Sequence, residues 1–271
     1  MDNGIHFISG LPRSGSTLFA AILGQNPRFH AGMSSPVGSL AIALQRNMSN
    51  ENDMAVFIDN ERRTNILRAL FPAYYQAIHP HKVVFDTNRL WCSKMPLITH
   101  LFPKAKVIAC IRHIPWIVDS VERLVRQNPL EPSKMFGFEV GGTVYNRFDT
   151  LASSNGMVGY AYHALREAFF SQESDRLLLL SYETLTAKPE YALREVYKFI
   201  DEPYFEHDFE DVTYDADEFD FRLGAPGLHR VSGPVRARNR KTILPPDLFQ
   251  RMQPDSFWLD PKTNIRDVKI I

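Results

Sequence analysis

The residues best suited to chemistry lie near the start of the chain, in the segment Phe7–Leu18, which reads FISGLPRSGSTL. A short apolar run that predicts a buried strand leads into a glycine-containing turn, and a helix is expected to begin at about Gly15. Several backbone N–H groups and the positive end of a helix dipole then surround one point, which predicts a phosphate or other anion site. The residues expected at the anion are Pro12, Arg13, Ser14, Gly15, Ser16 and Thr17.

The kind of transfer follows from what this loop lacks. The spacing from Gly10 to Gly15 matches G-x-x-x-x-G, but Ser16 stands where a Walker A motif has lysine. No carboxylate pair is plainly placed for Mg²⁺, so the sequence lacks both the lysine and the metal ligands that a P-loop kinase uses. A metal-independent transfer from a donor that already carries phosphates, such as sulfuryl transfer, fits these residues better. A plain strand–helix turn rich in glycine and serine is the competing interpretation.

A second anion anchor is predicted at Arg112, which ends the apolar run 107–111. Ligands bind at the carboxyl ends of strands in open α/β sheets, and Arg112 lies at such an end. Ser120 follows eight residues later, about two turns into the expected helix, where it can lean toward the same spot.

The elements that must position these residues alternate between strand and helix. Short apolar runs at 5–9, 83–86, 107–111 and 177–181 predict buried parallel strands. Helical spacing is found at 16–26, 116–127, 157–172 and 190–200. The alternation predicts a three-layer, P-loop-like α/β fold with a central parallel sheet flanked by helices. We expect one domain over residues 1–271, with a lid or excursion at 128–155.

Composition limits the classes of function. Lys+Arg and Asp+Glu both number 31, and this neutrality argues against a general nucleic-acid or anionic-membrane binder. Residues 201–220 hold ten acidic side chains, read here as a solvated face, and residues 222–241 hold six basic ones. The stretch 222–245 is expected to close over an anion. The two cysteines, the missing leader and the lack of a long apolar stretch favour a cytoplasmic protein without a membrane helix.

These residues resemble the sulfotransferases that use 3′-phosphoadenosine-5′-phosphosulfate (PAPS). The segment from Pro12 to Thr17 resembles that family's 5′-phosphosulfate loop, and Arg112 with Ser120 resembles its 3′-phosphate motif. PRSGSTL is most similar to the tyrosylprotein branch and its bacterial relatives. Tyr182, in the segment SYETL, corresponds to a tyrosine near the adenine. The resemblance covers residues 5 to 200 and extends weakly into the basic loop.

The resemblance implies transfer of a sulfuryl group to an acceptor hydroxyl with release of adenosine 3′,5′-bisphosphate (PAP), without a metal. Arg13 and Lys94 are the candidates for neutralising the charge on the leaving group. The glutamate that the tyrosylprotein branch uses as base is absent near Gly32. The cytosolic branch instead uses a histidine just after a strand, and the resemblance places Asp86 at roughly that position, which makes it the first candidate for the base, ahead of His229 and His30. An aspartate that ends a buried strand can also be a structural cap for the next helix. A sulfotransferase-like nucleotide-binding protein without catalysis stays an alternative.

The remaining expectations concern contacts with nucleotide and acceptor. The candidates for nucleotide phosphates in the basic loop are Arg230, Arg236, Arg238 and Lys241. Arg89 and Trp91 suit an acceptor pocket, although both could equally be packing residues. A small molecule, a sugar and a peptide tyrosine all offer the hydroxyl required, and a homodimer is left open.

Overall fold

A six-stranded parallel sheet forms the centre of the computed structural model, which describes residues 4–78, 82–130, 133–136 and 142–271. The strand order is β2-β3-β1-β4-β5-β6, and every neighbouring pair is parallel. The strands are β1 (Ile5–Gly10), β2 (Phe29–Ala31), β3 (Val83–Thr87), β4 (Val107–Ile111), β5 (Leu177–Ser181) and β6 (Lys269–Ile270).

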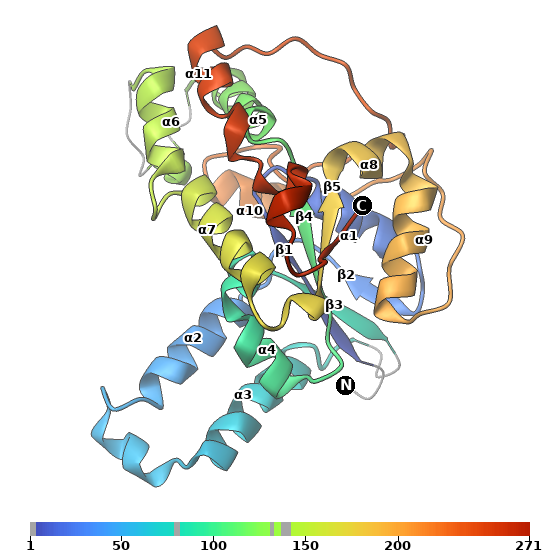
Figure 1. Ribbon diagram of the computed structural model, residues 1–271. Helices are drawn as coiled ribbons and strands as arrows, with labels where there is room; N and C mark the ends of the chain where they lie inside the picture. The colour runs from blue at the N-terminus through green and yellow to red at the C-terminus, as the bar shows by residue number, and fades with distance from the viewer. Residues whose placement is uncertain (1–3, 79–81, 131–132, 137–141) are drawn as a thin grey trace.

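Helices cover both faces of the sheet (Figure 1). The α-helices are α1 (Ser16–Leu23), α2 (Val37–Asn47), α3 (Asn60–Tyr74), α4 (Met95–Leu101), α5 (Ile114–Gln127), α6 (Val144–Ala152), α7 (Met157–Phe170), α8 (Tyr182–Ala187), α9 (Pro189–Ile200), α10 (Asp217–Arg222) and α11 (Pro246–Arg251). Short 3₁₀ helices are η1 (Asp53–Phe57), η2 (Arg89–Lys94), η3 (Lys134–Phe136), η4 (Ser174–Arg176), η5 (Gln253–Asp255), η6 (Phe257–Leu259) and η7 (Pro261–Thr263).

The strands are buried on both faces because their side chains alternate between two cores. Phe7 of β1 belongs to a core that includes side chains of α3, α4, α5 and α7, whereas the next residue, Ile8, belongs to one that includes side chains of α1, α8 and α9. The same alternation along β4 sends Val107 to the first core and Ile108 to the second. This arrangement confirms the predicted three-layer α/β fold with a parallel sheet.

The structure confirms the four predicted strands and the four predicted helices, with small shifts of their ends. It adds the edge strands β2 and β6, which are three and two residues long. Such segments are too short to show a period of two, so the sequence does not reveal them. The predicted excursion at 128–155 contains η3 and α6; its residues 131–132 and 137–141 lie outside the described part.

A long arm formed by α2, η1 and α3 extends away from the sheet (Figure 1). Among the described residues, no helix combines the length and apolar character needed to cross a bilayer.

His6 on β1 gives stability a dependence on pH. Its Nδ1 accepts a hydrogen bond of 3.1 Å from the backbone N–H of Lys106, so the ring must be neutral at that nitrogen. Burial, helped by the charge of Lys106, lowers the pKa of His6 from 6.5 to about 4. Between pH 6.5 and 4, His6 is therefore protonated in the unfolded chain but not in the folded chain. The free energy of unfolding falls as the pH falls through this window.

Between pH 7 and pH 5 we expect His6 to remove about 2 kcal/mol from the free energy of unfolding. Urea unfolding of the wild type and of His6→Gln at both pH values measures this. Glutamine can accept the same N–H but does not titrate, so the loss should shrink by that amount. An equal loss in both proteins would contradict the assignment.

Candidate active site

The turn after β1 takes a backbone shape that its glycines permit. Gly10 has φ of +103°, and a Cβ there would lie 2.2 Å from the carbonyl oxygen of Cys110 on β4. Gly15, with φ of +91°, precedes α1, and its Cβ would lie 2.8 Å from the Tyr182 ring. Arg13 is also in the left-handed region, at φ of +56°. The turn thus lies tightly against β4 and α8 and leads directly into the N-terminus of α1.

Ser14 contributes to this turn differently from the sequence-based expectation. Its side chain is buried, and its hydroxyl donates to the backbone carbonyls of Leu11 and Cys110. The hydroxyl is therefore engaged in holding the loop on β4, and Ser16 and Thr17 are the loop hydroxyls that line a cavity.

That cavity, called the loop cavity below, has a volume of about 440 Å³ and lies at the carboxyl ends of β1 and β4. Its walls come from the turn, from Arg112, from Ser120 on α5, from Tyr182 on α8 and from the segment 227–240. Two segments far apart in the sequence thus meet there. The sequence-based prediction had placed both anion anchors at this edge of the sheet.

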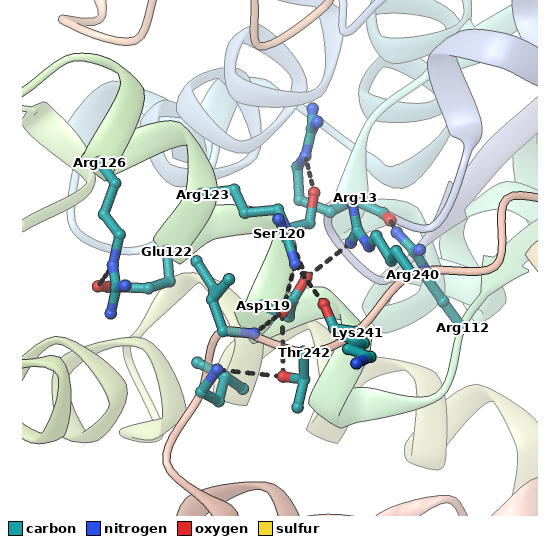
Figure 2. Close-up of polar contacts among 12 residues, drawn as sticks. Arg13, Arg112, Asp119, Ser120, Glu122, Arg123, Arg126, Arg240, Lys241 and Thr242 are labelled. Carbon is teal, nitrogen blue, oxygen red and sulfur yellow. Dashed lines mark hydrogen bonds and ion pairs between the residues drawn. The ribbon is translucent and has the colours of Figure 1, made fainter.

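Contacts join the two predicted anchors (Figure 2). Arg13 donates from Nε to the Ser120 hydroxyl at 3.1 Å, and Arg112 donates from Nη1 to the Arg13 carbonyl at 3.1 Å. The guanidinium carbon of Arg112 lies 4.1 Å from the centre of the Tyr182 ring. The buried Nε of Arg112 has no hydrogen-bond partner.

The electrostatics of the loop cavity favour an anion. Burial, together with the charge of Arg112, lowers the pKa of Arg13 to about 10, and burial also lowers the pKa of Arg112. In the part of the chain that the structure describes, neither guanidinium forms an ion pair with a carboxylate. The two guanidiniums are half-buried and lie side by side, and the nearby carboxylates, such as Asp220 for Arg13, act on them without a direct ion pair. Cations placed in this way gain from an anionic ligand.

The basic segment contributes to the same cavity unevenly. Arg230 and Arg236 line it while also pairing with Asp217 and Glu210, each at 2.7 Å. Arg238 and Arg240 line it as well. Lys241 does not; its carbonyl accepts from Arg123 at 2.6 Å. The sequence had put Lys241 forward, but Arg240 is the residue at the cavity wall.

Asp119 fixes the end of this segment on α5 (Figure 2). Its buried carboxylate accepts from Arg123 at 2.8 Å, from the Thr242 hydroxyl at 3.0 Å and from the Ile243 N–H at 2.8 Å. Arg240 lies 2.9 Å from the same carboxylate as an ion pair, without hydrogen-bond geometry. Because Asp119 adjoins Ser120, the basic segment and the second anchor are held together.

A smaller pocket of about 60 Å³, called the side pocket below, also borders the loop and shares part of its lining with the loop cavity. Ser34, Asn88, Arg89 and Met157 line it together with the loop itself. His229 lines both the side pocket and the loop cavity, so it stands where the two meet. Its Nδ1 lies 2.5 Å from the carboxylate of Asp220.

The other sequence-based candidates lie elsewhere. Asp86 is fully buried and accepts from Tyr75, Trp91 and Ser35 at 2.6 to 2.7 Å. Burial raises the pKa of Asp86 overall, although those hydrogen bonds act in the opposite direction.

Three other candidates line neither pocket. Trp91 is in the core, and Lys94 ends η2. His30 on β2 lies edge-on to Tyr75, 5.5 Å between ring centres, and also lines neither.

Comparison with known proteins agrees with this geometry. The profile of the Sulfotransferase family matches residues 6–206. The chain belongs to the sulfotransferase family. Protein-tyrosine sulfotransferase 1 of Danio rerio is 24% identical over 237 residues, which cover 85% of this chain and 61% of that protein. The chain thus spans about three fifths of that relative's length.

Solved structures of sulfotransferases share the fold. The sulfotransferase domain of the curacin biosynthetic pathway superposes with a TM-score of 0.50 at 18% identity, covering 74% of each chain. STF9 of Mycobacterium avium gives 0.50 at 13% identity, covering 94% of this chain and 76% of that one. The sulfotransferase of Alicyclobacillus acidocaldarius gives 0.50 at 12% identity, covering 82% and 89%.

Two residues at this candidate site were missed from sequence. Arg240 was one of six basic residues in 222–241, and nothing in the local pattern distinguished it. Asp220 lay inside the acidic run that was read as a solvated face. The pairing of Asp220 with His229 depends on a chain reversal through 223–228, which local patterns do not encode.

Proposed function

We propose that this member of the family moves a sulfuryl group from PAPS to the hydroxyl of an acceptor and releases PAP. The observation that carries the proposal is the pair Arg13 and Arg112. These two cations form no ion pair with a carboxylate among the described residues, and they line the cavity that the start of α1 also lines. A donor that carries phosphates at both ends of a nucleoside matches two linked anion anchors. The unpartnered Nε of Arg112 supports the fit.

PAPS supplies, when bound, an activated sulfuryl group on a phosphate oxygen. Arg13 and the N–H groups at the start of α1 would hold the 5′-phosphosulfate and neutralise the charge that grows on the bridging oxygen. Arg112 and Ser120 would hold the 3′-phosphate, and Tyr182 would lie near the adenine. Arg230, Arg236, Arg238 and Arg240 are the cations of the basic segment available to the nucleotide.

The base is best assigned to His229. It stands between the loop cavity and the side pocket, where donor and acceptor would meet. Asp86, by contrast, is sealed in the core by three hydrogen bonds, and its geometry suits a structural role. Arg89 and Asn88 line the side pocket and are proposed to contact the acceptor.

Within the described ranges, no group of three or more His, Cys, Asp or Glu side chains is placed to hold a metal ion. The proposal assigns the neutralisation of charge to arginines and backbone dipoles. A protein tyrosine is one acceptor class to test, because the Danio rerio relative is named for it. Phenols, sugars and alkyl alcohols are the other acceptor classes to include in the assay.

The proposal predicts that PAP stabilises the protein, by about 2.7 kcal/mol at a hundredfold excess over its Kd. Thermal unfolding with PAP and with ATP–Mg²⁺ shows which of the two nucleotides stabilises the protein. Labelled PAPS with pooled acceptors then measures transfer, with and without EDTA, and the rate should not change with EDTA. Stabilisation by PAP without transfer to any acceptor would favour a nucleotide-binding protein without catalysis, and stabilisation by ATP–Mg²⁺ alone would favour a kinase.

A further inference from the structure

Asp220 differs from the acidic residues around it. Residues 201–220 are rich in carboxylates, and its neighbours in α10, Asp217 and Glu218, are exposed. Asp220 is 0% exposed. A carboxylate that is withdrawn from water needs strong partners to offset its desolvation, and no lysine or arginine pairs with Asp220 in the described part of the chain. Its side-chain partner is His229.

Both oxygens of Asp220 are committed to that one residue. Oδ2 accepts from the His229 backbone N–H at 2.8 Å, and Oδ1 lies 2.5 Å from Nδ1 of the imidazole. Since an ionised carboxylate can only accept, Nδ1 must carry the proton in this contact. The ring nitrogen that remains to accept a proton is Nε2.

The ring is fixed by its surroundings as well. The Phe219 ring lies edge-on to the imidazole, 5.6 Å between ring centres. Arg13 donates from Nη1 to the carbonyl of Leu228, the residue before His229. The backbone N–H of Ala225 donates to the Asp220 carbonyl at 2.9 Å, which closes the turn between α10 and the histidine. The loop after β1, through Arg13, and α10 therefore hold the histidine from two sides.

We infer that Asp220 is a positioning residue for the reaction: it holds His229 as the Nδ1–H tautomer, with Nε2 left to take the acceptor's proton. This rests on the proposed function. The acceptor O–H proton passes to Nε2 while the acceptor oxygen bonds to sulfur and the sulfur–phosphate oxygen bond breaks. The buried carboxylate then balances the imidazolium charge until the proton returns to solvent.

Asp220→Asn tests the inference, because the amide keeps the size of the side chain but also offers a donor to Nδ1. We expect kcat to fall by at least about 100-fold, while the affinity for PAP and the KM for PAPS change by less than about threefold. Nitrogen-15 NMR of the His229 ring gives a second readout: the wild type should show the proton on Nδ1, and the variant should lose that signature. Glu218→Gln, an exposed change in the same helix, is the matched control and should alter neither.

The outcomes separate the two proposals. Absence of transfer by the wild type with every acceptor would refute the proposed function. Transfer by the wild type together with an unchanged kcat in Asp220→Asn would overturn the positioning role. A wild-type ring protonated on Nε2 would also overturn it, and this measurement decides the matter even if the variant does not fold.

Discussion

Replacing His229 with alanine is expected to slow sulfuryl transfer by about 10²- to 10⁴-fold, the usual contribution of a general base. His229 lines both the loop cavity and the side pocket, and it has a buried carboxylate partner in Asp220. Without it, the acceptor hydroxyl must lose its proton to water. Binding of PAP should stay within about threefold of the wild type, because the proposed phosphate anchors Arg13 and Arg112 remain. Rapid-quench or steady-state rates with labelled PAPS, alongside calorimetric titration with PAP, measure the two effects.

The matched control is His100→Ala. His100 lies on α4, lines neither the loop cavity nor the side pocket, and should leave the rate unchanged. Asp86→Asn separates the two sequence-based candidates for the base, since it changes the buried carboxylate that Tyr75 and Trp91 hold. We expect that variant to lose stability while its folded fraction keeps its turnover. A normal rate in His229→Ala with a large loss in folded Asp86→Asn would reverse the assignment.

Replacing Arg13 with alanine is expected to weaken PAP binding by about 1–3 kcal/mol, the scale of a charged hydrogen-bonding partner. Isothermal titration calorimetry should detect this as a rise in Kd of roughly 5- to 150-fold. Arg13 is half-buried beside Arg112 and forms no direct ion pair with a carboxylate among the described residues, so a bound phosphate would be its direct ionic partner. The rate of sulfuryl transfer should fall by a larger factor than the Kd for PAP rises, because negative charge on the leaving oxygen grows in the transition state.

Arg62→Ala provides the control for loss of one positive charge. Arg62 lies at the start of α3, is exposed and pairs with Asp59. Its removal should leave the affinity for PAP unchanged. Arg13→Lys keeps the charge but cannot reproduce the planar contacts with Ser120 and Leu228, so an intermediate Kd is expected. Unaltered affinity in Arg13→Ala would show that the loop is not the phosphate site.

Local patterns were sufficient for the central part of the fold. The strands β3, β4 and β5 contain the unbroken apolar runs 83–85, 107–111 and 177–180, because a parallel strand between two helical layers is buried on both faces. The edge strands β2 and β6 are two or three residues long and are defined by pairing with β3 and β5, so the sequence carries no local sign of them.

The same distinction holds for the site. The sequence by itself predicted an anion loop at 12–17 and a second anchor at Arg112 and Ser120, and these residues meet at one cavity. Their positions could be predicted because glycines at fixed spacing, an arginine at a strand end and a helical serine act through local backbone geometry. Only the tertiary structure decided that Ser14 is engaged with β4, that Arg240 rather than Lys241 reaches the cavity and that Asp86 is sealed in the core. It also decided that Asp220 pairs with His229. The physical reason is that burial and partner choice arise where distant segments meet, and a side chain's type alone does not say which neighbours will surround it.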